Sequence, residues 1–213
     1  MAILDSVDWD SVRAAYEDRV SVSGTLLQLY NQRSVEKFAN LALGVSNPDG
    51  NYSAAEHNLG PKILYYNKNA AQRVYDLAGD FISLTSARCV PDLIRKRDLK
   101  YLKIGVGSEI SCMMNPKICW VANTRTIWTH LVIKHADNIK KADEELKLYR
   151  EADESSEMYY PIWTAIHAEL AVALTRVAEL GRDSANKMKV TPGGIIYIWA
   201  DAIASALYSK HHG

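Results

Sequence analysis

Apolar residues recur at helical spacing along nearly the whole chain, and no stretch alternates apolar and polar residues for long enough to form a sheet. In the segment 161–180 the apolar positions repeat every three or four residues: Ile162, Ile166, Leu170, Leu174 and Val177. This spacing places side chains on one face of an α-helix, whereas a half-buried strand requires alternation. We therefore predict an all-α protein with about seven to nine helices.

Capping and stopping residues suggest where these helices begin and end. The expected helices lie after Asp8, at 34–44, at 63–84, at about 91–103, from a cap at Ser108, from 116 past 130, at 137–153, at 161–180 and from 191 onward. The segment 44–62 carries turn-forming dipeptides, among them Asn47-Pro48 and Gly60-Pro61. It is predicted to be one long loop near 44–62, which a short helix at 53–58 would shorten.

The chain has 213 residues, of which 48% are hydrophobic and 23% are charged. This length fits a single compact domain over 1–213, which is able to fold without disulfides or metals. An internal division into an N-terminal helical lobe, 1–84, and a C-terminal lobe, 91–213, is the alternative. The composition is that of a soluble globular protein rather than a disordered or integral membrane protein.

The charges balance, because 25 Lys and Arg residues face 25 Asp and Glu residues. Net neutrality removes long-range repulsion between copies of the chain, and it also removes any global attraction to nucleic acid or anionic lipid. A nucleic acid would therefore need a local basic patch. The 12 Tyr and 5 Trp residues greatly outnumber the 2 Phe residues. Because Tyr and Trp are enriched where surfaces meet a partner, we expect a homo-oligomer or filament.

Disulfide, metal and membrane signals are weak. The three cysteines form no C-x-x-C pair, and His167-Ala168-Glu169 matches the H-x-E fragment of zinc deaminases without the P-C-x-x-C that should follow. His167 lies on an apolar stripe and is predicted to be a core or interface histidine. The N-terminus does not resemble a signal peptide, and Asp201 interrupts the apolar segment 193–208. We expect a protein without metal, cofactor or membrane partner, in the cytoplasm of its own cell or of a host.

Basic residues gather within sixteen positions, close to one tyrosine: Arg88, Arg95, Lys96, Arg97, Lys100 and Lys103, with Tyr101. Lys and Arg on one helix can contact successive phosphates, while a tyrosine can stack on an unpaired base. These residues, together with Arg125, are the predicted nucleic-acid-binding set. The alternative is a solvated amphipathic helix whose inward residues are Ile94, Leu99 and Leu102.

The segment "RTIWTH" places Arg125 and His130 five positions apart. This R-x4-H pattern resembles the active-site motif of HEPN-type ribonucleases, which are all-helical, although Thr126 stands where that family usually has a polar residue such as Asn. The resemblance implies a metal-independent ribonuclease in which two chains join their pairs, with histidine in proton transfer and arginine at the phosphoryl charge. Alternatively, Arg125 is a partly buried residue that bridges to a carboxylate, a carbonyl or a phosphate. His130 lies about 140° round the helix from it.

The leading hypothesis is a non-enzymatic, self-assembling protein that binds single-stranded RNA or DNA, of the viral coat or nucleocapsid type. It rests on neutrality, on the Tyr and Trp enrichment and on the Tyr-containing basic stretch. The metal-independent ribonuclease is the first alternative, and a helical scaffold or adaptor is the second.

Overall fold

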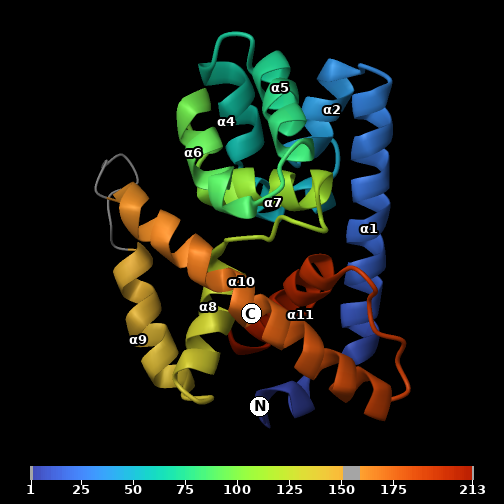
Figure 1. The fold of residues 1–213 in the computed structure, drawn as a ribbon, viewed down its shortest axis with the longest axis vertical. Coiled ribbons are helices and arrows are strands. Elements are labelled where there is room, and N and C mark those ends of the chain that lie inside the picture. The colour runs from blue at the N-terminus through green and yellow to red at the C-terminus, as the bar shows by residue number, and fades with distance from the viewer. Residues whose placement is uncertain (1, 151–158, 213) are drawn as a thin grey trace. The chain divides into compact units, whose positions relative to one another are not determined.

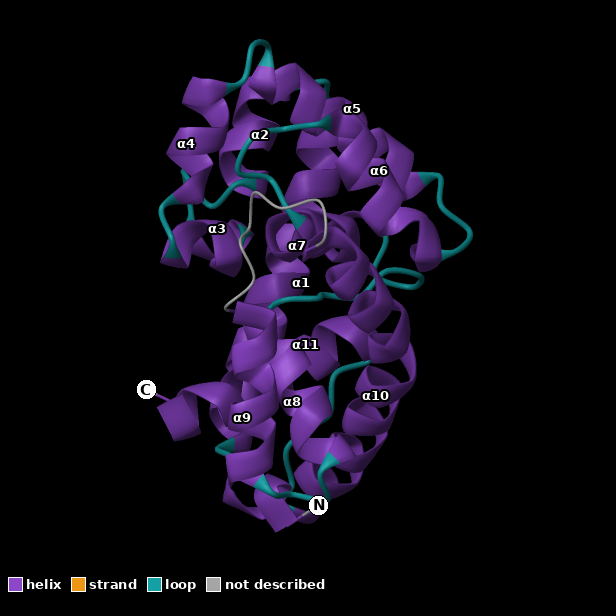
Figure 2. Cartoon of the chain, turned by 90° about the vertical axis from the view of Figure 1, so that its left-hand side faces the viewer, coloured by secondary structure: helices purple, strands orange, loops and turns teal. Residues whose placement is uncertain are grey.

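The computed structural model of the protein describes residues 2–150 and 159–212, and every regular element within them is helical (Figures 1 and 2). The predicted all-α class is confirmed for these residues. The predicted count of seven to nine helices is too low, because these residues form eleven α-helices. They are α1 (Trp9–Asn31), α2 (Val35–Ala42), α3 (Tyr52–Glu56), α4 (Leu59–Tyr66), α5 (Ala70–Ile82), α6 (Val90–Arg97), α7 (Ile104–Met114), α8 (Thr124–Lys134), α9 (Ile139–Arg150), α10 (Tyr159–Lys187) and α11 (Ile196–His212). Three 3-10 helices accompany them: η1 (Ala2–Ser6), η2 (Pro48–Gly50) and η3 (Ala87–Cys89).

The chain divides into two compact units, which are best described separately. The terminal unit comprises residues 1–16 and 124–213, and the central unit comprises residues 17–123. Helix α1 begins in the terminal unit and continues into the central unit. The lobe boundary predicted between 84 and 91 lies inside the central unit.

The terminal unit is built on α11, which packs against α8 and α10. Trp199 of α11 is completely buried, and its ring contacts those of Trp9 and Tyr16 at centroid distances of 6.0 and 5.7 Å. The Tyr16 hydroxyl accepts hydrogen bonds from the Gly194 and Ile195 amides at 3.0 and 3.1 Å. The first turns of α1 therefore hold the connection between α10 and α11 in place.

The central unit is built on α7, of which every residue except Gly105 is buried. Helix α7 packs against α3, α5 and α6, and Figure 2 shows it end-on among the helices of this unit. Helix α2 adds a second layer by packing against α5, with Phe38 completely buried. A helix that is enclosed on all sides must satisfy its polar side chains internally.

Glu109 of α7 and Arg19 of α1 form a buried ion pair in the central unit. Arg19 Nη2 lies 3.4 Å from Glu109 Oε2, and only 1% of the Arg19 side chain and 0% of the Glu109 side chain are exposed. The carboxylate also accepts hydrogen bonds from the Tyr52 amide at 2.8 Å and the Ser53 amide at 3.0 Å, at the start of α3. The Ser53 hydroxyl donates at 2.6 Å and the Asn123 side-chain amide at 3.1 Å. One carboxylate thus ties three separate segments to α7.

The predicted long loop near 44–62 is wrong, because this segment folds into η2, α3 and the first turn of α4. Its turn-forming asparagines act as helix caps. The Asn47 side chain accepts from the Asp49 amide, and the Asn51 side chain accepts from the Ala54 amide. These residue types favour caps as well as turns, so their presence did not distinguish a loop from a series of short helices. The short helix expected at 53–58 is confirmed as α3.

Several other predicted helices differ from the structure. The helix expected at 63–84 is divided into α4 and α5 at Asn69, and the helix expected at 91–103 ends with α6, because Asp98 follows it with a φ of 45°. Asn69 also has a positive φ, of 54°. Asn and Asp enter the left-handed region more readily than other non-glycine residues, which allows the chain to leave a helix there. Ser108 lies inside α7 and does not begin a helix.

The helix expected from 116 begins only at Thr124. Residues 119–123 are buried but not helical, and the Ala122 amide donates to the Ser108 hydroxyl at 2.9 Å. An apolar run of this kind is compatible with any buried conformation, so its hydrophobicity did not specify a helix.

The helix expected at 161–180 extends to Lys187 in α10, and the helix expected from 191 begins only at Ile196 in α11. Three further predictions agree with the structure. The Asp8 carboxylate accepts hydrogen bonds from the Asp10 and Ser11 amides at the start of α1. Gly44 follows α2 with a φ of 68°, as expected of a helix-stopping glycine. Within the helix expected at 137–153, α9 is confirmed, and residues 151–153 lie outside the described residues. None of the described helices combines the length and the apolar character needed to cross a membrane.

Replacing Glu109 with Ala should lower the free energy of unfolding by about 3 to 5 kcal/mol, because Arg19 would remain buried without its carboxylate. Denaturation in urea measures this change. The matched control is Glu36→Ala, an exposed carboxylate on α2, for which we expect a loss below about 1 kcal/mol. Equal losses in the two variants would show that the buried pair does not stabilise the central unit.

Candidate nucleic-acid interface

Three tyrosines and two lysines form a group on the surface of the central unit, which we call the tyrosine–lysine cluster: Lys62, Tyr65, Tyr66, Lys100 and Tyr101. The Tyr65 and Tyr66 ring centroids are 4.9 Å apart, and those of Tyr66 and Tyr101 are 5.4 Å apart. The Lys100 ammonium lies 5.0 Å from the Tyr66 centroid and 5.4 Å from that of Tyr101. The Lys62 ammonium lies 6.0 Å from the Tyr101 centroid.

Helix α4 supplies the first half of the cluster. Ile63 is completely buried and anchors the helix, while Tyr65 and Tyr66 follow on its outer surface. Tyr65 is 81% exposed and Tyr66 is 54% exposed. Large aromatic side chains normally bury most of their area, so two neighbouring tyrosines left this open are unusual in a folded protein. They present ring faces that another molecule could cover.

The chain between α6 and α7 supplies the second half. Leu99 and Leu102 are buried at 3% and 2% exposure, and they anchor the segment on either side of Lys100 and Tyr101. The Asn67 side chain holds the main chain of this segment in place. Its amide donates to the Lys100 carbonyl at 3.0 Å, and its oxygen accepts from the Lys100 amide at 2.8 Å. Asn67 follows α4 directly, so it joins the two halves of the cluster.

The chemistry of the cluster suits an aromatic anion. An ammonium within about 6 Å of a ring face is attracted by its π electrons, so Lys62 and Lys100 are held close to the tyrosines. The exposed rings can stack on a flat aromatic group, and the ammonium groups can contact a phosphate beside it. A nucleotide presents this combination of a flat base and a charged phosphate.

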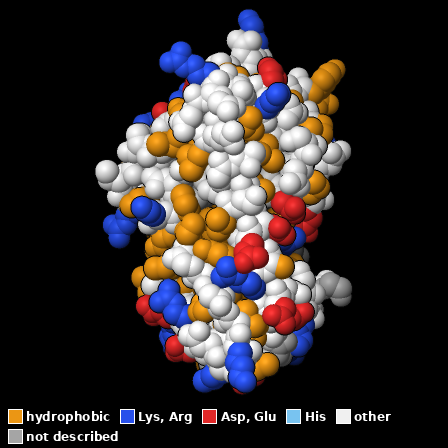
Figure 3. All heavy atoms as spheres, turned by 90° about the vertical axis from the view of Figure 1, so that its right-hand side faces the viewer, with side chains coloured by type: hydrophobic (Ala, Val, Ile, Leu, Met, Phe, Trp, Pro, Cys, Tyr) orange, Lys and Arg blue, Asp and Glu red, His pale blue; other side chains and the backbone are white. Residues whose placement is uncertain are grey.

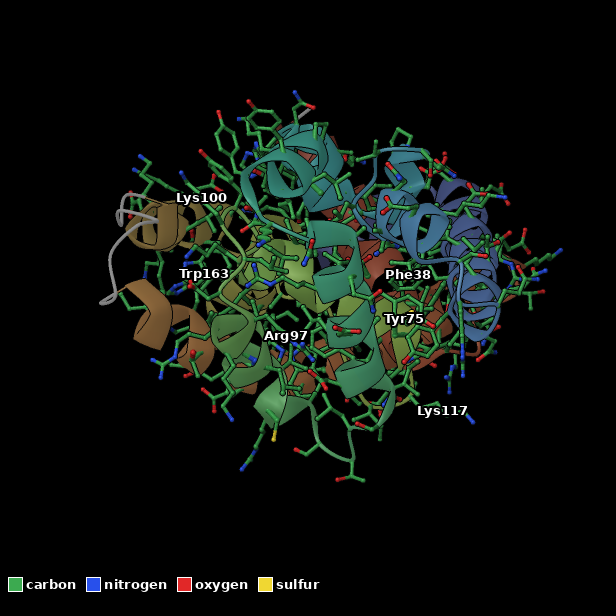
Figure 4. The ribbon with its side chains drawn as sticks, turned by 90° about the horizontal axis from the view of Figure 1, so that it is seen from above. Phe38, Tyr75, Arg97, Lys100, Lys117 and Trp163 are labelled. Atoms are coloured by element: carbon green, nitrogen blue, oxygen red, sulfur yellow. The ribbon has the colours of Figure 1, made fainter. Side chains whose placement is uncertain are left out.

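Only Lys100 and Tyr101 of the predicted binding set belong to the cluster. Arg97 instead forms an ion pair with Asp80 of α5, and its Nε donates to Asp80 Oδ2 at 3.2 Å. Arg73 donates to the Arg97 carbonyl. Arg97 and Lys100 are well separated in Figure 4. The main chain and side chain of Arg97 thus take part in the packing of α5 against α6.

The other predicted cations of the central unit are exposed: Arg88, Arg95, Lys96 and Lys103. They do not share one helix, because α6 ends at Arg97 and Lys103 directly precedes α7. The alternative assignment of inward residues is confirmed for Ile94, Leu99 and Leu102, which are all buried. Binding of nucleic acid by the exposed cations stays a prediction.

Lys62, Tyr65 and Tyr66 were not among the predicted binding residues. The signal that could have identified them is the pair of adjacent tyrosines in "KILYYNKN". Adjacent residues on a helix project about 100° apart, so two tyrosines in a row cannot both be fully buried where the helix packs through a narrow face. Their approach to Lys100 and Tyr101 depends on the turn at Asn67, which the sequence pattern did not reveal.

Arg125 and His130 both lie on α8, in the terminal unit. Arg125 is half-buried, and 14% of the His130 side chain is exposed. His130 Nε2 lies 3.6 Å from Glu169 Oε2 of α10. Burial lowers the pKa of His130, and the nearby Glu169 carboxylate opposes that shift in part. The ribonuclease alternative requires two chains to bring their Arg/His pairs together, and it stays a prediction.

His167 of α10 is 1% exposed, as expected of a core histidine. Burial lowers its pKa to about 4, so the ring is neutral near pH 7. No group of three His, Cys, Asp or Glu residues suited to holding a metal ion occurs within 2–150 and 159–212.

Comparisons of the chain with protein-family models, with curated proteins and with solved structures gave no match.

We expect no RNA cleavage in EDTA by the wild-type protein or by His130→Ala, because only a small part of the His130 side chain is open to a substrate. Arg125→Ala should lower the free energy of unfolding. The substitution removes the half-buried guanidinium group, so the polar groups that interact with it lose their partner. Gel analysis of labelled RNA and urea denaturation measure the two effects. Metal-free cleavage that disappears in His130→Ala would instead establish the ribonuclease alternative.

Proposed function

We propose that this protein binds single-stranded RNA or DNA through the tyrosine–lysine cluster, and that it does so as a non-enzymatic, self-assembling protein of the viral coat or nucleocapsid type. The observation that carries the proposal is the exposure of Tyr65 and Tyr66, at 81% and 54%, with the Lys100 ammonium over Tyr66 and the Lys62 ammonium near the adjoining Tyr101.

Base stacking on tyrosine supports a preference for single strands. The bases of a duplex are already stacked and paired, so their faces are not available to Tyr65 and Tyr66. An unpaired base can cover a ring face, and each such contact contributes about 1 to 3 kcal/mol to binding. The exposed lysines add phosphate contacts, which make the affinity dependent on salt.

The distribution of charge favours a local site over a broad basic surface. Lys and Arg side chains lie among Asp and Glu side chains on the face shown in Figure 3. With 25 charges of each sign, attraction to a polyanion must come from a few cations in the right place. Lys62 and Lys100 meet this requirement because each stands next to an exposed or half-buried ring.

Self-assembly is the second part of the proposal. Neutral net charge allows copies of the chain to approach one another without long-range repulsion. The terminal unit also exposes apolar side chains, with Val172 of α10 at 79% and Met188 at 66%, which contact between copies would cover. A scaffold that assembles without nucleic acid remains the third candidate, and binding measurements separate it from the first.

Replacing Tyr65 and Tyr66 together with Ala should weaken binding of an unstructured 12-nucleotide RNA by about tenfold or more, because two stacking platforms are removed. The double variant Lys62→Ala/Lys100→Ala should also reduce the slope of log K against log salt by about 0.7 for each phosphate that the protein no longer binds. Fluorescence anisotropy at several salt concentrations measures both quantities.

Two controls accompany these variants. Phe at positions 65 and 66 keeps the ring faces and should keep the affinity. Lys140→Ala/Lys141→Ala removes two adjacent exposed lysines from α9, in the terminal unit, and should leave the affinity and the salt slope nearly unchanged. If the cluster variants bind as tightly as the wild type, the proposed site is wrong.

A further inference from the structure

The two most exposed rings of the cluster stand almost perpendicular to each other. The planes of Tyr65 and Tyr66 meet at 87°, with their centroids 4.9 Å apart. Consecutive residues of a helix project about 100° apart, so Tyr65 and Tyr66 leave α4 in different directions. Tyr66 is further fixed by Tyr101 and Lys100, which lie against it. The rings therefore offer two binding faces with different orientations.

Two adjacent bases cannot occupy both faces and remain stacked on each other. Stacked neighbours are nearly parallel and about 3.4 Å apart, whereas bases lying on Tyr65 and Tyr66 would be turned by roughly a right angle. The strand would have to separate these two bases and turn its backbone between them. The ammonium of Lys100, 5.0 Å from the Tyr66 centroid, is placed to contact the phosphate at that turn.

The free energy needed to separate two neighbouring bases depends on their identity. Adjacent adenines stack strongly within a single strand, while adjacent uracils stack weakly and leave the backbone flexible. Preferences of this origin are known for sites that bind bases by stacking without reading their hydrogen-bonding edges. A uridine-rich strand can adopt the separated arrangement with little loss of stacking.

We propose that the tyrosine–lysine cluster binds two adjacent bases in a splayed arrangement and therefore prefers uridine-rich RNA to adenosine-rich RNA. This inference rests on the proposed function, since it specifies the sequence class that the same site takes. Tyr65 and Tyr66 are the specificity-determining residues, because the preference arises from the angle between their rings. Lys62 and Lys100 contact phosphates and do not discriminate between bases.

The test compares labelled 12-nucleotide oligo(U) and oligo(A) by fluorescence anisotropy at one salt concentration. We expect the wild type to bind oligo(U) about threefold to tenfold more tightly than oligo(A). The ratio should decrease on warming, because heat unstacks oligo(A) in solution. Tyr65→Ala should bring the ratio close to one, since a single remaining ring no longer requires splayed bases, while Tyr65→Phe should keep it.

The possible results separate this inference from the function on which it rests. Equal affinities for the two oligonucleotides, or tighter binding of oligo(A), would overturn the splayed arrangement and leave single-strand binding in place. A preference that persists in Tyr65→Ala would overturn it as well. Failure of the wild type to bind either oligonucleotide would overturn the proposed function itself. Tyr65 is 81% exposed, so its replacement should not disturb folding, and circular dichroism of each variant verifies this.

Discussion

Glu109 and Arg19 carry opposite charges and are both buried, where an unpaired charge would be very costly because it has been taken out of water. Their pairing determines how the central unit can be assembled. The carboxylate binds the first two amides of α3, and Arg19 Nη1 donates to the Asp49 carbonyl at 2.9 Å. These contacts join α1, η2 and α3 around α7.

The tyrosine–lysine cluster depends on this arrangement at both of its ends. Helix α3 leads into α4, and the two pack together, so the segment capped by Glu109 also positions Tyr65 and Tyr66. The residues that carry Lys100 and Tyr101 lead directly into α7. Tyr101 has a φ of 70°, a conformation that costs a non-glycine residue about 1 to 2 kcal/mol. The buried leucines on either side and the Asn67 hydrogen bonds maintain it. Strained backbone of this kind is often found at functional sites.

The sequence was most informative where a local pattern determines the structure. The apolar pattern at 34–44, ending at Gly44, and the cap at Asp8 predicted helices that formed, and the inward positions of Leu99 and Leu102 were also correct. Each of these features requires only neighbouring residues. The sequence did not reveal where helices are interrupted. Asn69 and Asp98 can each adopt either helical or left-handed backbone, and tertiary contacts decide which conformation forms. The error at Asp98 led to the incorrect expectation that Lys100 and Arg97 share a helix.

The candidate site was predicted only in part for the same reason. Lys100 and Tyr101 were found because basic residues surround them in sequence, whereas Lys62, Tyr65 and Tyr66 reach them through the Asn67 turn. Arg97 was included for its charge, yet a carboxylate 17 residues earlier, on Asp80, binds it. Glu109 gave no signal, since one acidic residue among the apolar residues of α7 does not reveal its partners. Whether a basic residue is solvated or structural depends on an acidic partner that lies elsewhere in the sequence, and the sequence pattern does not show that partner.

The most direct measurement is the molar mass of the purified protein by light scattering, taken together with the 260/280 nm absorbance ratio of the same peak. It should be made on the wild type and on a variant with Ala at Lys62, Tyr65, Tyr66 and Lys100. The proposal predicts a wild-type assembly larger than a dimer with the absorbance of bound nucleic acid, and a variant that assembles with the absorbance of protein alone. A wild-type monomer whose mass does not change with concentration, and whose absorbance ratio is that of protein alone, would contradict it.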